Sequence, residues 1–464
     1  MDPPHLRTEH LREYRPICAR SDRDNIPFFL RLTRLKCVHI NFEVPIGWTA
    51  ADARWPIGGF LGAIMIATIA LPRLMRIGAG ASSELGNILS QLGLSRPLIV
   101  TDSHLVELGK LEKLMGSLDS SKICARLYSD VVLDPTVASV EACLAFLRAG
   151  NHDCVVGFGG GSSMDTAKAV AVLAVHGGAV SSYKAPHMQD PPGLPIIAIP
   201  TTAGTGSETT RFTIISDEKT NEKMLCVGLG FLPTASLVDY EQSFSMPKAL
   251  TAATGLDALC HALEGYISKR SHPFSQNIAV QAMRAIAPNL RRVFADPSDR
   301  FAREAVMLGA ALAGIAFSNS SVALIHGMAR PIGAFFHVPH GLSVAMLMPA
   351  VIEFSAPANI LLYANVARAM GLADEGESSE SAVNKLVNEF IAFNKDLEVP
   401  TPKSYGIDPG RWTSLLGTMA EQALASGSPA NNPRAASAEE IQQLYKKAWA
   451  GGEESQQLFK EAGA

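Results

Sequence analysis

The feature that most constrains the fold is a change of pattern near the middle of the chain. Between about residues 74 and 240, short apolar runs alternate with stretches of helical character, and each run is followed by a turn signal. The runs at 98–101, 154–158 and 194–199 are typical of buried strands. Strands that alternate with helices in this way form a parallel sheet covered by helices. The first half therefore predicts an α/β layer of the nucleotide-binding kind.

After about residue 245 the strand pattern stops and helical periodicity replaces it. We expect helices over 249–268, 273–293, 300–329, 341–354, 360–370 and 380–393. The sequence thus predicts an N-terminal extension at 1–64, an α/β domain at 65–244 and an all-α domain at 245–464. The extension has no clear amphipathic period, and we leave open a disordered arm, an untypical targeting segment and translated sequence upstream of the true start.

Composition excludes several classes of protein. Of 464 residues, 47% are hydrophobic and 18% are charged, which suffices for large cores and excludes a mainly disordered chain. The net charge of −4 argues against nucleic-acid binding. The uncharged run at 55–72 is interrupted by glycines and bounded by prolines, so we expect no membrane span. We expect an alternating edge strand within 66–80. Seven cysteines without a CxxC pair predict free thiols in the cytoplasm.

The first motif that carries chemistry is a glycine-rich turn, GFGGGSSMDTAK at 157–168, between a predicted strand and a predicted helix. Consecutive glycines let the backbone approach a ligand closely, and the N–H groups at a helix start favour a phosphate. The motif lacks the ending of a P-loop, and Ser162 stands where the Rossmann fingerprint has its third glycine. The alternative is a plain turn in which Ser162 and Asp165 form a capping box.

The second motif, PTTAGTGSE at 200–208, also follows a predicted strand. Its hydroxyl groups offer neutral hydrogen bonds to a ribose or an amide, and the alternative is a turn that satisfies its own backbone. These hydroxyls belong to Thr201, Thr202, Thr205 and Ser207.

The third and fourth motifs contain residue types that bind metals. Asp257 and His261 lie four residues apart in a predicted helix, so they share one face, and the alternative is an exposed pair on a helix surface. His326 and His340 would lie roughly 21 Å apart on one straight helix. We expect Pro331, Gly333 and Pro339 to break that helix and let the chain fold back. Three imidazoles and one carboxylate then form a ligand set with room for a substrate oxygen.

Taken together, the four segments resemble the iron-containing (group III) alcohol dehydrogenase family. GGGSxxDxAK, PTTAGTGSE, DxxxH and the two late histidines follow the family's order, and the resemblance runs from about Ile69 to Trp449. It implies a dehydroquinate-synthase-like architecture, with NAD(P) on the α/β domain and a divalent metal in the cleft against the helical domain. The metal would be iron, with zinc as the alternative, held by Asp257, His261, His326 and His340.

The resemblance also implies the cofactor contacts. Gly160, Gly161 and Ser162 would hold the pyrophosphate, the four hydroxyls would line the adenine and nicotinamide-ribose groove, and Lys223 would contact a ribose. The complete set implied is Asp102, Gly159, Gly160, Gly161, Ser162, Asp165, Thr201, Thr202, Thr205, Ser207 and Lys223.

Two residues bear on specificity. Asp102 follows the strand at 98–101, where the family places a residue facing the adenosine ribose. A carboxylate there repels a 2′-phosphate, so we expect NAD to be preferred over NADP, with a helix cap as the alternative. Arg330 departs from many family members, which have a second histidine at this position. Its planar fork suits an anionic substrate group, and the alternative is that it pairs with a nearby acid.

The sequence therefore predicts a metal-dependent NAD(P) alcohol dehydrogenase or aldehyde reductase that transfers a hydride between a small alcohol and nicotinamide. Its partners would be a small alcohol or aldehyde and a second copy of the chain, with no nucleic acid or membrane. Rival functions are a maleylacetate-reductase-like, glycerol-dehydrogenase-like or dehydroquinate-synthase-like activity. A rival of another class is a catalytically idle nucleotide-binding protein, which should have lost metal ligands.

Overall fold

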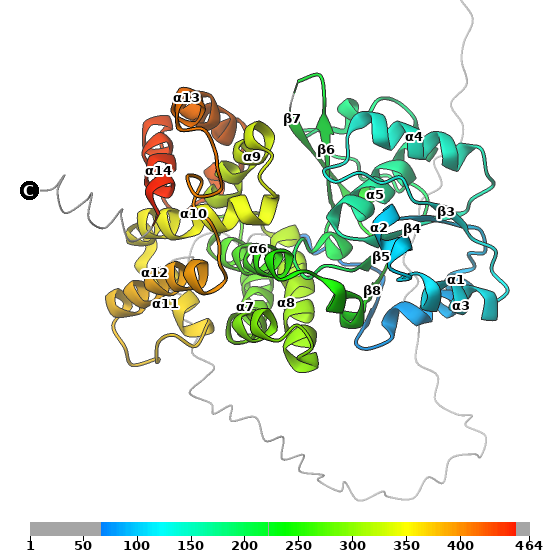
Figure 1. Cartoon of the computed structure of the whole chain (residues 1–464), viewed down its shortest axis with the longest axis horizontal. Coiled ribbons are helices and arrows are strands. Elements are labelled where there is room, and N and C mark those ends of the chain that lie inside the picture. The colour runs from blue at the N-terminus through cyan, green and yellow to red at the C-terminus, as the bar shows by residue number, and fades with distance from the viewer. Residues whose placement is uncertain (1–65, 221, 452–464) are drawn as a thin grey trace, which may run out of the picture. The chain divides into compact units, whose positions relative to one another are not determined.

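The computed structural model describes residues 66–220 and 222–451 (Figure 1). The N-terminal extension expected at 1–64 and the start of the apolar run at 55–72 lie outside the described residues. The remaining residues of that run, 66–72, form no helix, and the first strand in the described part of the chain begins at Leu74.

A six-stranded parallel sheet occupies the first half, in the order β1-β8-β5-β4-β2-β3. The predicted buried strands are confirmed as three adjacent central strands, and the first strand is confirmed as an edge strand. The strands are β1 (Leu74–Ile77), β2 (Pro97–Val100), β3 (Arg126–Tyr128), β4 (Cys154–Gly159), β5 (Ile196–Pro200) and β8 (Ala235–Val238).

Helices cover both faces of this sheet, as the continuous apolar sequences of the central strands require. Successive side chains of β4 point to opposite faces, so Val155 packs in one apolar cluster with Val170, whereas Val156 packs in another with Leu114. The helices are α1 (Leu85–Leu92), α2 (Ser103–Glu107), α3 (Glu112–Ser120), α4 (Val137–Arg148) and α5 (Gly161–His176).

A separate antiparallel hairpin was not predicted. It consists of β6 (Phe212–Asp217) and β7 (Glu222–Val227), packed beside α5. Its strands alternate buried with partly exposed positions, a weaker signal than the continuous apolar runs of the main sheet.

The second half is helical throughout, which confirms the predicted fold class (Figure 1). Its central helix, α6, is buried along most of its length and contacts α7, α8 and α10. The helices are α6 (Lys248–Ile267), α7 (Pro273–Ala295), α8 (Arg300–Asn319), α9 (Leu324–Phe336), α10 (His340–Ser355), α11 (Ile360–Ala369), α12 (Ser379–Asp396), α13 (Pro409–Ala425) and α14 (Ala438–Ala450).

One detail of the helical prediction is wrong and another is confirmed. The single helix expected over 300–329 is two helices, because the chain turns at 320–323 while the apolar pattern continues across the turn. The break expected between His326 and His340 is confirmed, because α9 ends at Phe336 and α10 begins at His340 after Pro339. Pro331 and Gly333 lie inside α9 and do not make the break. The helix ends where His337 adopts a left-handed conformation with φ 55°.

Among the described residues, two helical segments are long and apolar enough to cross a membrane, Arg300–Asn319 and His340–Ala369. Most of the apolar window in each is buried within the protein, as in the core helices of many proteins that never enter a membrane.

Candidate active site

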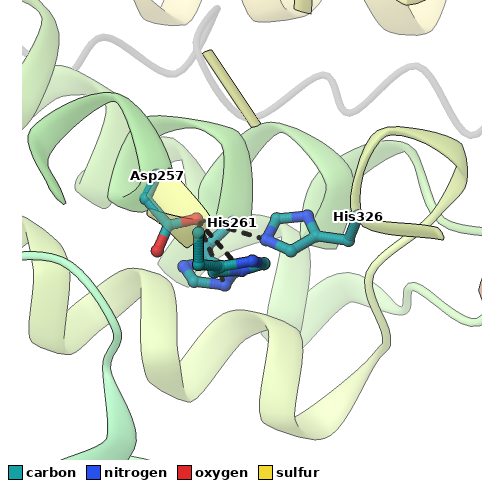
Figure 2. A group of neighbouring side chains, drawn as sticks. Asp257, His261 and His326 are labelled. Carbon is teal, nitrogen blue, oxygen red and sulfur yellow. Dashed lines mark ion pairs between the residues drawn. The ribbon is translucent and has the colours of Figure 1, made fainter. Parts of the chain in front are cut away.

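Four side chains that sequence analysis selected converge in the helical half. Asp257 and His261 lie one turn apart on α6, and His326 lies in the first turn of α9 (Figure 2). His340 begins α10. Asp257 Oδ1 lies 4.0 Å from His261 Nε2, 3.4 Å from His326 Nε2 and 3.7 Å from His340 Nε2. The potential ligand atoms all lie within 4.8 Å of one another. We call Asp257, His261, His326 and His340 the ligand cluster.

The cluster contains buried polar atoms without hydrogen-bond partners. Asp257 Oδ1 and His326 Nε2 both lack a partner among the described residues, although they face each other. Leaving such groups unsatisfied costs free energy, and a cation would satisfy both by accepting their lone pairs. The donor set therefore fits a divalent metal, because one carboxylate and three imidazoles suit iron or zinc.

Burial sets the charge of these groups. Burial lowers the pKa of His261 to about 3 and that of His340 to about 4, so both imidazoles are neutral at pH 7, the form that binds metals. Burial opposes charge on Asp257 as well, but the neighbouring histidines hold its pKa well below the usual range. For His326, burial lowers the pKa, but the hydrogen bonds and charges of Asp257 and Glu264 outweigh this effect and raise the pKa to about 9. A proton and a cation therefore compete at His326.

Glu264 supports the cluster, and sequence analysis missed it. Its carboxylate accepts hydrogen bonds from His326 Nδ1 at 2.7 Å, from the Ala323 amide at 2.8 Å and from the Ile325 amide at 2.6 Å. The first contact orients His326 with Nε2 toward Asp257, and the other two occupy amides at the start of α9. The signal was available: Asp257, His261 and Glu264 follow one another at spacings of four and three on one helix face.

A second possible ligand group overlaps the first at His326 but uses its other nitrogen. Cys260 and Glu264 lie beside His326 Nδ1, with the Cys260 sulfur 3.8 Å away. Burial raises the pKa of the Cys260 thiol well above its usual value, so the thiolate that binds metals is disfavoured. Because the Glu264 oxygens already accept three hydrogen bonds, this group supports the ligand cluster instead of forming a second metal site.

The predicted nucleotide residues gather at one edge of the sheet. The strands β2, β4 and β5 are parallel neighbours, so their carboxyl ends lie together and bring Asp102, the glycine-rich turn and the hydroxyl-rich turn to the same edge. Gly160 is the N-cap of α5 and no side chain caps this helix, so the capping box considered for Ser162 and Asp165 is wrong. The α5 amides thus keep their capacity to bind an anion.

Some hydroxyl groups of the hydroxyl-rich turn already form hydrogen bonds within the protein. Thr205 Oγ1 accepts a hydrogen bond from the Ser207 amide, and the Ser207 hydroxyl donates to Asp165 at 2.7 Å. Asp165 also accepts from the Ile214 amide of β6, so both its oxygens are engaged within the protein. Thr202 differs, because its buried hydroxyl has no partner among the described residues. The Thr201 amide donates to the carbonyl of Gly159, which joins the two turns.

Close packing explains two glycines of the first turn. Gly159 has φ 149°, and an added Cβ would overlap the Ser163 hydroxyl. At Gly161 a Cβ would lie 3.0 Å from Thr205, so a side chain here would press the two turns apart. The glycine-rich and hydroxyl-rich turns therefore depend on backbone contact that larger residues would prevent.

Asp102 and Lys223 both have protein partners. Asp102 caps α2 by accepting from the Leu105 amide at 3.0 Å, as its alternative interpretation expected. Lys223 extends from the hairpin and forms an ion pair of 3.0 Å with Asp134, which sequence analysis missed. The Asp134 amide also donates to the Ser162 hydroxyl, and its positive φ of 53° suits an aspartate turn. The hairpin, α9 and the glycine-rich turn meet here, since a Cβ on Gly333 would lie 3.4 Å from Lys223 Nζ.

Arg330 lies on α9 one turn after His326 and is partly buried. No ion pair or hydrogen bond to its side chain occurs in residues 66–220 and 222–451, so the alternative in which it pairs with a nearby acid is wrong for this part of the chain.

Comparisons with known proteins agree on one family. The family model for iron-containing alcohol dehydrogenase matches residues 72–240, and its C-terminal model matches residues 251–449. Lactaldehyde reductase of Escherichia coli is 36% identical over 374 residues, covering 80% of this chain and 97% of the relative. The NAD-dependent methanol dehydrogenase of Bacillus methanolicus is 32% identical, covering 82% and 98%. The crystal structure of a 1,3-propanediol oxidoreductase has a TM-score of 0.79 and 33% identity, covering 83% and 100%.

Proposed function

The chain belongs to the iron-containing alcohol dehydrogenase family, and we propose that its ligand cluster holds the divalent metal that this family uses. It is an NAD(P)-dependent alcohol dehydrogenase and aldehyde reductase, which transfers a hydride between a CH–OH carbon and nicotinamide. The observation that carries the metal proposal is the convergence of Asp257 Oδ1 and His326 Nε2, two buried atoms that face each other at 3.4 Å and have no hydrogen-bond partner among the described residues.

When bound, a divalent cation supplies Lewis acidity that favours the alkoxide form of an alcohol and polarises an aldehyde carbonyl. The chain's own residues prepare for this. Asp257 contributes one negative charge, His261 and His340 contribute neutral imidazoles, and Glu264 holds His326 in the orientation that directs Nε2 toward Asp257. All four side chains except that of His340 are buried, so the protein displaces water from most of the cluster.

We propose that the nucleotide lies along the carboxyl ends of β2, β4 and β5. The uncapped amides at the start of α5 suit the pyrophosphate, and the unpartnered Thr202 hydroxyl suits a ribose or the nicotinamide amide. Lys223 and Ser162, joined through Asp134, suit the ribose next to the metal site. The Ser207 hydroxyl donates a hydrogen bond to Asp165, so we propose that this pair positions the two turns relative to each other and does not contact the nucleotide.

We further propose that NAD is preferred over NADP. Asp102 stands at the end of the central strand β2, and only one of its carboxylate oxygens is used in capping α2. The other oxygen can accept a hydrogen bond from a ribose 2′-hydroxyl and would repel a 2′-phosphate.

We assign iron(II) to the site because the chain belongs to the iron-containing family. Zinc is the competing metal, because three imidazoles and a carboxylate suit both ions. We place the enzyme in the cytoplasm, in keeping with the free thiols of Cys124, Cys143, Cys154, Cys226 and Cys260. We also expect it to work as a homodimer.

The deciding experiment measures metal content and turnover on the same preparation. Purified protein is analysed by elemental mass spectrometry, treated with a chelator and then reloaded with Fe²⁺ or Zn²⁺ while NADH oxidation by an aldehyde is followed. About one equivalent of metal per chain and loss of turnover on chelation, restored by reloading, support the proposal. Full turnover in metal-free protein would overturn it.

A further inference from the structure

We propose that Arg330 determines substrate specificity by binding an anionic group on the substrate, remote from the reacting carbon. This inference rests on the proposed function, because the reacting oxygen must lie at the ligand cluster. It adds a substrate class: short aldehydes and alcohols that carry a carboxylate, sulfonate or phosphonate.

The position of Arg330 places its charge beside the reaction site. It lies four residues after His326 on α9, so both side chains leave the same face of the helix, about one turn apart. Gly333, one turn further along the same face of α9, lies against the hairpin, because a Cβ on it would lie 3.4 Å from Lys223 Nζ. Arg330 therefore leaves α9 between His326 of the ligand cluster and the point where Lys223 approaches the helix.

Arg330 has no counter-charge of its own in the described part of the chain. Glu264 is the acid whose charge acts on Arg330, but its oxygens are occupied by His326 and the amides of Ala323 and Ile325. Lys223, the cation that approaches α9 from the hairpin, differs because Asp134 lies 3.0 Å from its amine.

A partly buried cation without a partner costs free energy, and a bound anion removes that cost. The guanidinium is permanently charged and presents a planar fork of donors, which matches the two oxygens of a carboxylate or sulfonate. The reaction is the same as for a neutral substrate: aldehyde, NADH and a proton give alcohol and NAD⁺. The anionic group of the substrate remains unchanged.

The test uses matched substrates and metal-loaded full-length protein. Unbranched aldehydes of two to six carbons are compared in pairs whose far end carries either a carboxylate or a methyl group, and kcat/KM is measured for each. The proteins are the native enzyme, Arg330→Met, Arg330→Lys and the control Arg284→Met, which alters an exposed arginine on α7. We also measure the binding of the corresponding dicarboxylates to metal-loaded protein by calorimetry, which does not depend on turnover.

The native enzyme should prefer the acidic member at one or more chain lengths by roughly tenfold to a hundredfold, the range expected for hydrogen bonds between charged groups. Arg330→Met should remove that preference and the dicarboxylate binding while turnover of neutral aldehydes persists. Arg330→Lys should keep part of the preference, and Arg284→Met should keep all of it.

Two outcomes would overturn the inference while leaving the proposed function intact. One is a native enzyme that reduces neutral members at least as well as acidic ones at every length. The other is an Arg330→Met enzyme that keeps the acid preference but has a raised KM for NADH, since Arg330 would then bind a cofactor phosphate. Failure of the proposed function is distinct: metal-loaded native protein would reduce no member of either series.

Discussion

The ligand cluster on α6, α9 and α10 and the turns after β2, β4 and β5 differ in what their polar groups do within the protein. In the cluster, side chains provide the chemistry, and three of their buried atoms have no hydrogen-bond partner among the described residues. In the turns, backbone amides and small residues predominate, and Thr205, Ser207, Asp165 and Asp102 already have partners. A side-chain site fails when one group is removed, whereas a backbone site tolerates the loss of single side chains.

This comparison predicts the largest effect at the metal ligands. His261→Ala or His326→Ala should each lower turnover by about a thousandfold or more and remove bound metal, because neither lost donor has a substitute. Elemental analysis and NADH-linked assays measure both effects, and circular dichroism checks the fold. His176→Ala, at an exposed histidine of α5, serves as the matched control. Variants that kept both metal and turnover would break the distinction between the two regions.

A smaller effect is expected when the supporting carboxylate is changed. Glu264→Gln keeps the size of the side chain but loses the charge that orients His326, so metal affinity should fall by roughly tenfold to a hundredfold. Competition with a chelator of known affinity measures the change. An unaltered affinity would show that His326 is held by packing alone.

The sheet half offers a test of stability instead of activity. Burial raises the pKa of Glu208 to about 7, so the folded protein holds a proton there that the unfolded chain releases from about pH 4.5 upward. Stability should therefore fall by up to about 3 kcal/mol as pH rises from 4.5 to 7.

Glu208→Gln should remove this component. Urea unfolding at pH 5 and pH 7.5 compares the two proteins, and the difference in their pH dependence isolates Glu208 from other titrating groups. Parallel pH profiles for the native and Gln proteins would argue against a buried, protonated carboxyl.

The smallest effect should come from Asp102→Gly. It should raise kcat/KM with NADPH relative to NADH by about tenfold, since the repulsion of a 2′-phosphate is lost. Loss of the α2 cap should also cost about 1 kcal/mol of stability, which thermal unfolding measures. If the cofactor ratio stayed fixed while stability fell, Asp102 would serve only as a cap.

Sequence patterns sufficed for the features that depend on local periodicity. The buried strands read as continuous apolar runs, and the spacing of Asp257 and His261 placed both on one face of α6. Features that depend on distant contacts were not predictable in this way. The turn at 320–323 interrupts an apolar pattern that shows no break, and Glu264 acquires its role only when α9 begins beside it.

The role of Arg330 also depends on distant contacts that the sequence does not reveal. The sequence offered two interpretations, an anion-binding residue or one half of an ion pair. Only the positions of acids from other helices distinguish them. The acid that acts on its charge, Glu264, belongs to α6 and is engaged elsewhere.

The strand order has a consequence for biosynthesis. The last strand of the sheet, β8, lies between β1 and β5. Among the described strands, β1 therefore has no hydrogen-bonded neighbour until the chain has been synthesised through Val238. More than half of the chain must therefore emerge from the ribosome before β8 can pair with β1. During this time β1, a short and mainly apolar strand, stays exposed. Conditions that slow elongation between β5 and β8 should increase the yield of aggregated nascent chains.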